Sequence, residues 1–322
     1  MQKIEEAGAL PKEVQTTGKK LCTFDVGICV TGEAAGLPSL VRTVLAEEPE
    51  GFALQKVVIV ASACSPSTIS EARRLAASEP TVQLIEHETR EGKANAINEI
   101  VRLGDSDLLV FVNADAAPDP ASISRILRSI GGDRELGVVS GRPVFESEGG
   151  LTSLVLDVMW TAHNINSFRL NMRGQGNHGT DELMVVRRDL LDELPEGLVN
   201  DGAYISGRVR EQGFRAGFEP DATVRIDVPK RMADLIVQRR RILYGHMQVK
   251  KLVGKAPSTV ETLMFFRPAE GFRILIQTLA GRPKLLLSLP VAAVSEIVAF
   301  GGALYDSATS DRSHAVWRRY AV

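Results

Sequence analysis

Two kinds of apolar stretch alternate along the first two thirds of the chain. Short runs rich in Val, Ile and Leu predict buried strands at 25–31, 56–62, 82–87, 107–112 and 136–141. Stretches with apolar residues three and four apart predict helices near 37–45, from 67, at 91–103 and near 122–130. This alternation is typical of an α/β fold, so we expect a mostly parallel central sheet with helices on both faces.

The pattern continues to residue 228 and then changes. Up to that point we expect a helix at 151–170, a Gly-rich polar loop at 174–180, a strand at 182–187, a short helix from 188, a helix from 200 to about 213, and closing strands at 214–218 and 223–228. Beyond it we expect an amphipathic helix at 231–251, a less regular stretch at 265–281 and a nearly uncharged stretch at 285–304. We therefore divide the chain into an extension at 1–22, an α/β domain at 23–228 and a helical region at 229–322.

The strand at 107–112 is the most informative for chemistry, because it is followed by the polar triplet Asn113-Ala114-Asp115. A buried strand delivers the side chains that follow it to the carboxyl edge of the sheet, where open α/β sheets bind ligands. A carboxylate there can hold Mg²⁺ or Mn²⁺ against a diphosphate, because both ions prefer hard oxygen ligands. From this stretch alone, Asn113 and Asp115 can equally be turn and cap residues.

Composition changes this picture little. The 322 residues are 44% hydrophobic and 24% charged, which is ordinary for one large globular domain with an appendage. The net charge of −2 gives no overall attraction to nucleic acid, and we expect no nucleic-acid partner. Three scattered cysteines without metal-site spacing indicate reduced thiols, and the polar amino terminus lacks the apolar stretch of a signal peptide. We therefore expect a cytoplasmic protein.

Four separated motifs carry the candidate chemistry. They are Arg90-Glu91-Gly92-Lys93 with Ala96 and Asn98, Asn113-Ala114-Asp115, Asn200-Asp201 with Gly213 twelve residues on, and Gln238-Arg239-Arg240-Arg241. Arg90 and Lys93 lie where a strand gives way to a helix, and helix N-terminal amides with cationic side chains favour anions. Asp201 lies at a helix start, where it acts either as a base or as a cap.

In this order and spacing, the motifs over residues 24–250 resemble those of the family 2 glycosyltransferases of the GT-A fold. The resemblance implies a catalytic domain that moves a sugar, with inversion, from a nucleoside-diphosphate sugar to a hydroxyl acceptor. It implies Asp115 as the ligand of Mg²⁺ or Mn²⁺ and Asp201 as the catalytic base. It assigns donor binding to Glu33, Ser62, Arg90, Lys93, Asn113, Gln238, Arg239 and Arg241.

The chain departs from the family pattern at four points. Asn113 stands where the family usually has an acid, Ser62-Ala63-Cys64 replaces a loop that often carries Asp, Gly32 replaces an Asn, and Ile242 replaces a Trp. These departures leave open a catalytically weakened sugar-nucleotide-binding or scaffolding paralogue of the same fold. A nucleotidyltransferase is disfavoured because Gly32 and Gly36 fall short of a phosphate loop. An oxidoreductase is disfavoured because the first strand lacks G-x-G-x-x-G.

Three aromatic residues lie on the side where the acceptor is expected. His163 and His178 are candidates to touch substrate, although lone histidines are more often structural. Trp160 fits a core position better than a platform for a sugar.

The stretch at 285–304 has the length of a membrane helix but contains Glu296. Helical spacing places Ser288, Ala292, Ser295 or Glu296, and Ala299 on one small and polar face, with Leu, Val, Ile and Phe opposite. Three interpretations stay open: an interfacial or half-inserted helix, a true span, and a soluble helix packed on the domain. Basic neighbours suit an anionic lipid surface. We therefore expect contact through residues 265–305 with the inner face of the cell membrane. The resemblance to family 2 glycosyltransferases implies a lipid-linked or glycan acceptor.

Overall fold

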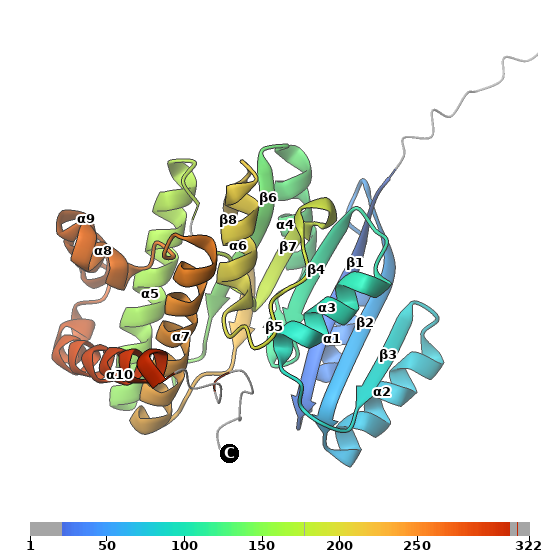
Figure 1. The fold of residues 1–322 in the computed structure, drawn as a ribbon, viewed down its shortest axis with the longest axis horizontal. Coiled ribbons are helices and arrows are strands. Elements are labelled where there is room, and N and C mark those ends of the chain that lie inside the picture. Colours follow the sequence, from blue (N-terminus) through green and yellow to red (C-terminus); the bar gives the residue numbers. More distant parts are fainter. Residues whose placement is uncertain (1–20, 177, 310–313, 315–322) are drawn as a thin grey trace, which may run out of the picture.

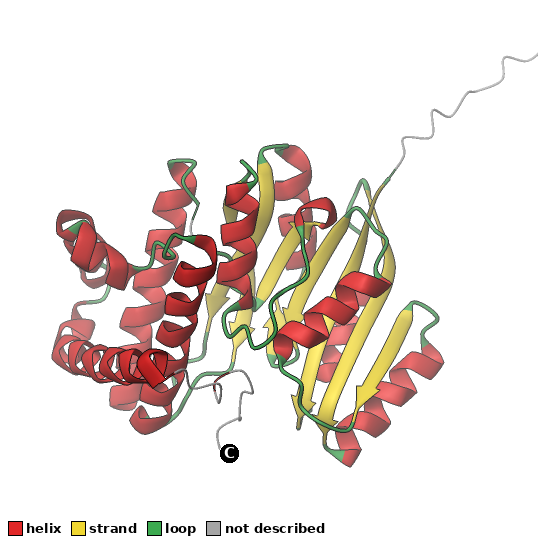
Figure 2. Cartoon of the chain, viewed as in Figure 1, coloured by secondary structure: helices red, strands yellow, loops and turns green. Residues whose placement is uncertain are grey.

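Eight strands form one sheet, in the order β3-β2-β1-β4-β7-β6-β8-β5, within the part of the chain that the structure describes (residues 21–176, 178–309 and 314). The structure is a computed structural model. Its strands are β1 (Cys22–Gly32), β2 (Phe52–Cys64), β3 (Val82–His87), β4 (Leu108–Asn113), β5 (Ala116–Pro118), β6 (Leu136–Val144), β7 (Leu183–Arg187) and β8 (Arg215–Ile226). The expected extension at 1–22 lies outside the described residues up to residue 20. Helices cover both faces of the sheet, which confirms the α/β class, and further helices form a layer at one end (Figures 1 and 2).

The amino-terminal half of the sheet is parallel, as the strand–helix alternation predicts. β1 pairs in parallel with β2 and β4, and β2 pairs with β3. Residues of α1 (Leu37–Leu45), α2 (Pro66–Ser78) and α4 (Ser122–Gly132) pack into one core, and residues of α3 (Lys93–Leu103) and α6 (Asp201–Glu211) pack into another. Successive strand residues point to opposite faces, so Val57 and Val58 enter different cores.

The carboxyl-terminal half of the sheet is mixed. β7 runs antiparallel to β4 and β6, whereas β6 and β8 are parallel. The prediction of two closing strands is wrong, because a single strand, β8, continues through a register shift between Phe218 and Thr223. Pro220 lies in the shifted stretch and has no N–H to donate to a ladder.

The helix expected near 122–130 is confirmed, but a short strand before it was not predicted. Residues 116–118 form β5, antiparallel to β8, and α4 begins at Ser122. A strand of three residues is too short to show an alternating pattern in the sequence.

The antiparallel direction of β7 places its amino end beside the carboxyl end of β4. Leu183 pairs with Val112, and the N–H of Asn113 donates a hydrogen bond of 3.4 Å to the carbonyl of Glu182. Two acidic residues, Asp181 and Glu182, therefore arrive at the sheet edge where the motif of β4 ends.

The carboxyl-terminal region is helical throughout its described part. Its elements, together with the long helix that precedes it, are α5 (Gly150–Met172), α7 (Met232–Val253), α8 (Val260–Phe266), α9 (Pro268–Ala280), the 3₁₀ helix η2 (Pro283–Ser288) and α10 (Leu289–Thr309). The prediction of a less regular stretch at 265–281 is wrong, because Pro268 begins α9, and proline is tolerated in a first helical turn. The small face predicted for 285–304 is confirmed: Ser288, Ala292, Ser295 and Ala299 are buried, and α10 packs against α7.

Candidate active site

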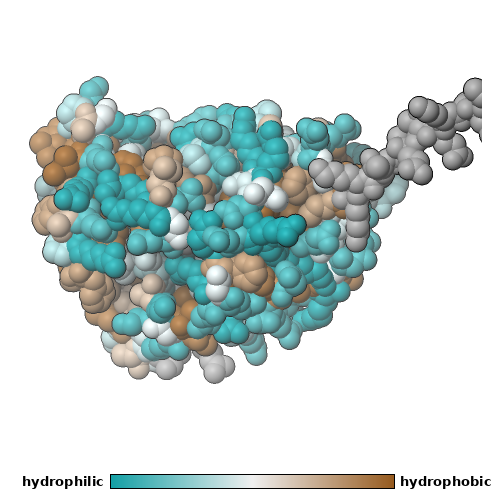
Figure 3. Space-filling model, turned by 90° about the horizontal axis from the view of Figure 1, so that it is seen from above, coloured by the Kyte–Doolittle hydropathy of each residue, from teal (hydrophilic) through white to brown (hydrophobic). Residues whose placement is uncertain are grey.

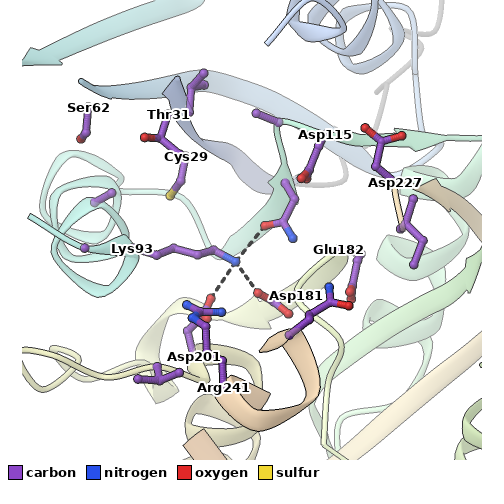
Figure 4. Close-up of a pocket in the computed structure, with 18 of the residues that line it drawn as sticks. Cys29, Thr31, Ser62, Lys93, Asp115, Asp181, Glu182, Asp201, Asp227 and Arg241 are labelled. Atoms are coloured by element: carbon purple, nitrogen blue, oxygen red, sulfur yellow. Dashed lines mark hydrogen bonds and ion pairs between the residues drawn. The ribbon is translucent and has the colours of Figure 1, made fainter. Parts of the chain in front are cut away.

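A cavity of about 260 Å³ lies at the carboxyl ends of β1, β2 and β4. Its charged and hydrogen-bonding lining residues come from both halves of the chain and are Thr31, Ser62, Arg90, Lys93, Asn113, Asp115, Asp181, Glu182, Asp201, Asp227, Gln238 and Arg241 (Figure 4). This is the edge of the sheet at which α/β folds bind ligands.

The pairing of the strands and one glycine bring these groups together. Thr31 pairs with Ser62, and Cys29 pairs with Asn113, so three strand ends are level at the cavity. Gly92 has a φ of +94°, a conformation that favours glycine, and it turns the chain into α3 at Lys93. The side chain of Lys93 therefore enters the cavity beside the end of β4.

The ammonium group of Lys93 is the centre of the polar network (Figure 4). Its Nζ donates a hydrogen bond of 2.8 Å to Oδ1 of Asn113 and lies 3.0 Å from Oδ2 of Asp201. It also forms an ion pair with Asp181. Two residues that the resemblance assigns to the donor, Lys93 and Asn113, thus bind each other and hold the predicted base.

The ammonium group of Lys93 affects the pKa values of its two carboxylate partners to different extents. Burial and the neighbouring Asp181 raise the pKa of Asp201, against the opposing effect of Lys93. Burial also acts to raise the pKa of Asp181, but the attraction of Lys93 outweighs it and the pKa lies below its ordinary value. Burial lowers the pKa of Lys93, yet the two carboxylates outweigh that effect and raise it. Asp201 is therefore the more basic carboxylate, which suits acceptance of a proton.

Asn200, and not Asp201, caps helix α6. The Oδ1 atom of Asn200 accepts a hydrogen bond of 3.1 Å from the N–H of Ala203. Asp201 is the first residue of the helix, and its side chain is only 6% exposed and points at Lys93. The interpretation of Asp201 as a cap is therefore excluded.

Two side-chain amides hold the segment that leads to Asp201. Asn98 accepts a hydrogen bond of 2.8 Å from the N–H of Leu194 and donates one of 2.9 Å to its carbonyl. Gln248 of α7 accepts one of 2.9 Å from the N–H of Val199. Asn98, the last residue of the first motif, thus has a structural role: it positions the chain before the predicted base.

The residues around Asp115 fit a divalent cation that substrate phosphates also bind. Asp115 follows β4, and Asp227, after β8, lies opposite it (Figure 4). Glu182 lines the same cavity, and its Oε2 is buried without a hydrogen-bond partner in the described part of the chain. Burial, followed by the charge of Asp181, raises the pKa of Glu182 to about 8. Among the described residues, no three His, Cys, Asp or Glu side chains form a complete cage. Mg²⁺ commonly uses one or two carboxylates together with substrate phosphates, so this donor set fits.

Most of the residues assigned through the resemblance line the cavity; these are Ser62, Arg90, Lys93, Asn113, Asp115, Asp201, Gln238 and Arg241. Glu33 does not line it, and it accepts a hydrogen bond of 3.1 Å from the hydroxyl of Ser67.

Arg239 also lies away from this cavity. It donates a hydrogen bond of 2.5 Å to Glu296 of α10 and one of 2.7 Å to Glu261 of α8. Neighbouring helical residues point in different directions, so Gln238 and Arg241 share the cavity face while Arg239 and Arg240 join α7 to the helical layer.

Three acidic residues of the cavity were missed by the reading of the sequence: Asp181, Glu182 and Asp227. The adjacent acidic pair Asp181-Glu182 at the start of the strand predicted at 182–187 was the available signal. The sequence did not indicate the direction of that strand, and in a parallel strand the pair would lie at the opposite edge of the sheet. Asp227 gave no signal, because it follows a strand without any recognisable motif.

A second cavity of about 130 Å³ adjoins the first. Both cavities are lined by Trp160, Asp181, Glu182, Gln238 and Ile242. Three histidines of the second cavity form a row, with ring centroids 5.6 Å apart for His163 and His178 and 5.3 Å apart for His178 and His246. His246 was not predicted, because nothing in its local sequence distinguishes it from an ordinary residue of α7.

The fold and the first cavity together define the class: an α/β enzyme of the GT-A type, with acidic and cationic groups gathered at the carboxyl edge of its sheet. A comparison with protein families matches Glycosyl transferase family 2 over residues 25–194, which is more than half of the chain. The chain therefore belongs to Glycosyl transferase family 2 and is a glycosyltransferase.

A mannosyltransferase of known structure shares the fold at low sequence identity. The mannosyltransferase PcManGT from Pyrobaculum calidifontis, solved with GDP-Man and Mn²⁺, is 19% identical with a TM-score of 0.60, and the match covers 89% of this chain and 87% of that one. A mycobacterial protein is 18% identical with a TM-score of 0.47, over 71% of this chain and 74% of that one. No match was found among curated proteins.

Proposed function

We propose that the protein transfers a sugar from a nucleoside-diphosphate sugar to a hydroxyl group, with inversion at the anomeric carbon and with dependence on Mg²⁺ or Mn²⁺. The observation that carries this proposal is the meeting, in one cavity, of Asp115 at the end of β4 with Asp201 at the start of α6. Family membership supports sugar transfer, and the likeness to a mannosyltransferase solved with GDP-Man and Mn²⁺ supports the class of donor and of metal.

In this proposal, Asp201 takes the proton of the acceptor hydroxyl while the hydroxyl oxygen bonds to the anomeric carbon and the bond to the diphosphate breaks. Lys93 orients Asp201 and keeps it ionised before that step. Arg90 and Arg241 line the same cavity and bind the anionic donor by charge-assisted hydrogen bonds. When bound at Asp115, a divalent cation supplies positive charge to the leaving diphosphate.

Donor binding by the Asp115→Ala variant tests this proposal. A ligand that binds the folded state raises Tm, so unfolding is measured with GDP-mannose and a panel of UDP-sugars, with and without Mn²⁺. Asp115→Ala should abolish the Mn²⁺-dependent part of the shift. The matched control, Asp192→Ala, removes a carboxylate that is 64% exposed and should retain it.

Two outcomes contradict the proposal. An unchanged Mn²⁺-dependent shift in Asp115→Ala refutes the metal role. If no nucleotide sugar raises the Tm of the parent protein, donor binding itself is refuted.

A second candidate function is a sugar-nucleotide-binding or scaffolding protein of the same fold. The observation that favours it is Asn113, which stands in place of an acid and whose Oδ1 accepts a hydrogen bond from Lys93. Turnover separates the two candidates. Donor binding by the parent with Mn²⁺, but without transfer or hydrolysis, supports the second one.

We also propose that the protein works at the inner face of the cell membrane, on a lipid-linked or glycan acceptor. The carboxyl-terminal helices expose large side chains, called the apolar face below: Phe265, Phe266, Phe272, Ile276, Leu286, Leu287, Val294, Ile297, Val298, Phe300, Leu304 and Tyr305. Figure 3 shows hydrophobic side chains gathered at the end of the molecule that these helices occupy in Figure 1. Large exposed apolar surfaces are typical of interaction sites.

The packing of α10 supports a helix that lies on the membrane rather than one that spans it. Among the described residues, the segment 283–309 is long and apolar enough to cross a membrane. Its small face, however, is buried against α7, and its Glu296 pairs with Arg239. The opposite side remains for lipid, the arrangement of an interfacial amphipathic helix.

Vesicle binding by a variant of the apolar face tests this second proposal. Leu287 and Ile297 are 81% and 71% exposed, so Leu287→Glu with Ile297→Glu leaves the core intact. Binding to vesicles of phosphatidylglycerol and phosphatidylcholine should weaken about tenfold or more, because burying one large apolar side chain contributes about 1.5–3 kcal/mol. The control Leu103→Glu, at a 41% exposed residue of α3, should bind like the parent. A parent protein without vesicle affinity refutes membrane contact.

A further inference from the structure

We propose that the second cavity is the subsite for the acceptor, and that it takes an uncharged, hydroxyl-bearing ring such as the terminal sugar of a glycan or of a glycolipid. The inference rests on the proposed function, because an acceptor presupposes glycosyl transfer. It adds the chemical class of the acceptor and the residues that select it.

The position of the cavity fits an acceptor. Asn200 lines the second cavity and Asp201, the next residue, lines the first. The two cavities also share walls, among them Gln238 and Ile242. A ring seated in the second cavity therefore has one side toward the junction where Asp201 takes up a proton.

The three histidines give the cavity neutral hydrogen-bonding groups. Burial lowers the pKa of His163 and of His246 to about 4 and that of His178 well below its ordinary value. All three rings are therefore uncharged near pH 7. His246 is only 9% exposed, and its Nε2 is buried without a hydrogen-bond partner among the described residues. A buried polar atom without a partner is destabilising, and a hydroxyl group of a ligand removes that cost.

The charges in and around the cavity exclude an anionic ring. Arg239 lines it but is held by Glu261 and Glu296. Asp181 lines it too and is paired with Lys93. A carboxylate or phosphate placed here meets Glu261 and has only an already paired guanidinium to contact, so its desolvation is not compensated.

The remaining walls suit the apolar faces of a sugar ring. Leu156, Met159, Trp160, Leu235 and Val260 line the cavity with carbon surface. Ligand sites typically combine such walls with a few placed polar groups, which here are the histidines. The lining residues come from α5, α7, the loop before β7 and the start of α8, so the helical layer forms part of the site.

Glycoside binding, followed by NMR titration of the full-length protein with Mn²⁺ and a nucleoside diphosphate, tests the inference. The neutral probes are methyl and octyl β-D-glycosides of glucose, galactose and mannose, and the anionic probe is methyl β-D-glucuronide. At least one neutral glycoside should bind about tenfold or more tightly than the glucuronide. Tighter binding of the octyl than of the methyl glycoside identifies a glycolipid as the source, and equal binding identifies a soluble glycan.

Two pairs of variants locate the binding. Val260→Phe narrows the cavity and should weaken the neutral glycoside about tenfold, whereas the same change at Val237, 55% exposed on α7, should leave it unchanged. His246→Leu removes the hydrogen bond and should weaken it by a similar factor, and His246→Gln should restore part of the affinity. Nucleotide-sugar binding should persist in all four variants, because none of these residues lines the first cavity.

The outcomes distinguish this inference from the proposed function. The inference is overturned if nucleotide sugars bind but no neutral glycoside does, if the glucuronide binds equally well, or if Val260→Phe leaves glycoside affinity unchanged. If the parent binds no nucleotide sugar at all, the proposed function fails and the inference fails with it.

Discussion

The two adjoining cavities bury polar groups in opposite ways. In the first, one ammonium group stands among carboxyl groups, and Lys93 forms ion pairs with both Asp181 and Asp201. In the second, one histidine is buried and two are half-buried, and the pKa of each is lowered by desolvation. Desolvation acts in both places, but counter-charges outweigh it at Lys93, whereas it prevails at the three histidines.

This difference separates two tasks within one site. A nucleoside diphosphate and a cation bring charge with them, and the first cavity already contains both signs. A neutral ring brings none, and the second cavity offers it three neutral histidines, while Arg239 and Asp181 of its lining are held in ion pairs. The difference also follows the chain, because the sheet edge builds the first cavity and helices of the carboxyl-terminal layer complete the second.

The largest expected effect comes from removing the base from the first cavity. Asp201→Asn keeps the size of the side chain but removes its basicity, and general-base catalysis contributes about 10²–10⁴-fold. Turnover should fall by that order while donor affinity, measured by thermal shift, changes little. Because Asn200 caps α6, the loss cannot be attributed to the cap.

The matched control for this variant is Asp192→Asn, at an exposed carboxylate outside both cavities, and it should keep the turnover of the parent. Turnover within a few-fold of the parent in Asp201→Asn rules out Asp201 as the base.

The parallel half of the fold followed from the sequence, and the mixed half did not. From the regular strand–helix alternation we predict a helix near 37–45 and a strand at 82–87, and α1 and β3 have these bounds in the structure. The sequence did not indicate the direction of the strands after β4, because a strand of five residues such as β7 shows the same apolar pattern in either direction. Tertiary packing determines that direction.

The site residues at strand ends were likewise predicted in the parallel half of the sheet and missed in the mixed half. The motif residues of the parallel half, such as Lys93 and Asp115, lie together in the cavity. Asp181 and Glu182 were missed because they depend on the direction of β7. Arg239 was assigned to the donor because a motif does not show which side of a helix each residue occupies, and it pairs with Glu261 and Glu296 instead.

The second effect in size comes from removing the counter-charge of the first cavity. Lys93→Met leaves Asp181 and Asp201 without their cation, and breaking a buried ion pair costs about 3–5 kcal/mol. Urea unfolding at pH 7 should show a loss of about 3 kcal/mol or more, and acidic pH should reduce the loss because the carboxylates then protonate. Lys230→Met is the matched control, since Lys230 and its partner Glu148 are 74% and 63% exposed, and it should unfold like the parent. Equal stability of Lys93→Met and the parent contradicts the central role of Lys93.

The smallest expected effect comes from protonating a histidine of the second cavity at acidic pH. It is also the sharpest test of the difference between the two cavities. Burial lowers the pKa of His163 to about 4 from an ordinary value near 6.5, while Glu261 partly opposes the shift and Arg239 adds to it. Above pH 6.5 the ring is neutral in the folded and unfolded states and contributes nothing to pH dependence. As the pH falls from about 6.5 toward 4, the unfolded state binds a proton that the folded state does not, so the free energy of unfolding decreases, by at most about 1.4 kcal/mol per pH unit.

His163→Gln removes this titration and keeps a hydrogen-bonding side chain. Urea unfolding of the parent and the variant at pH 7.5 gives the cost of the substitution itself, because the ring is neutral there in both states. Between pH 6 and pH 5 the parent should lose about 1 kcal/mol more than the variant does, after that cost is subtracted. Other groups titrate in the same range, including Glu182, whose raised pKa acts in the opposite direction, but they are common to both proteins and cancel in the difference. Parallel pH profiles for the two proteins would show that His163 is protonated equally in the folded and unfolded states, and the second cavity would then be a charged site like the first.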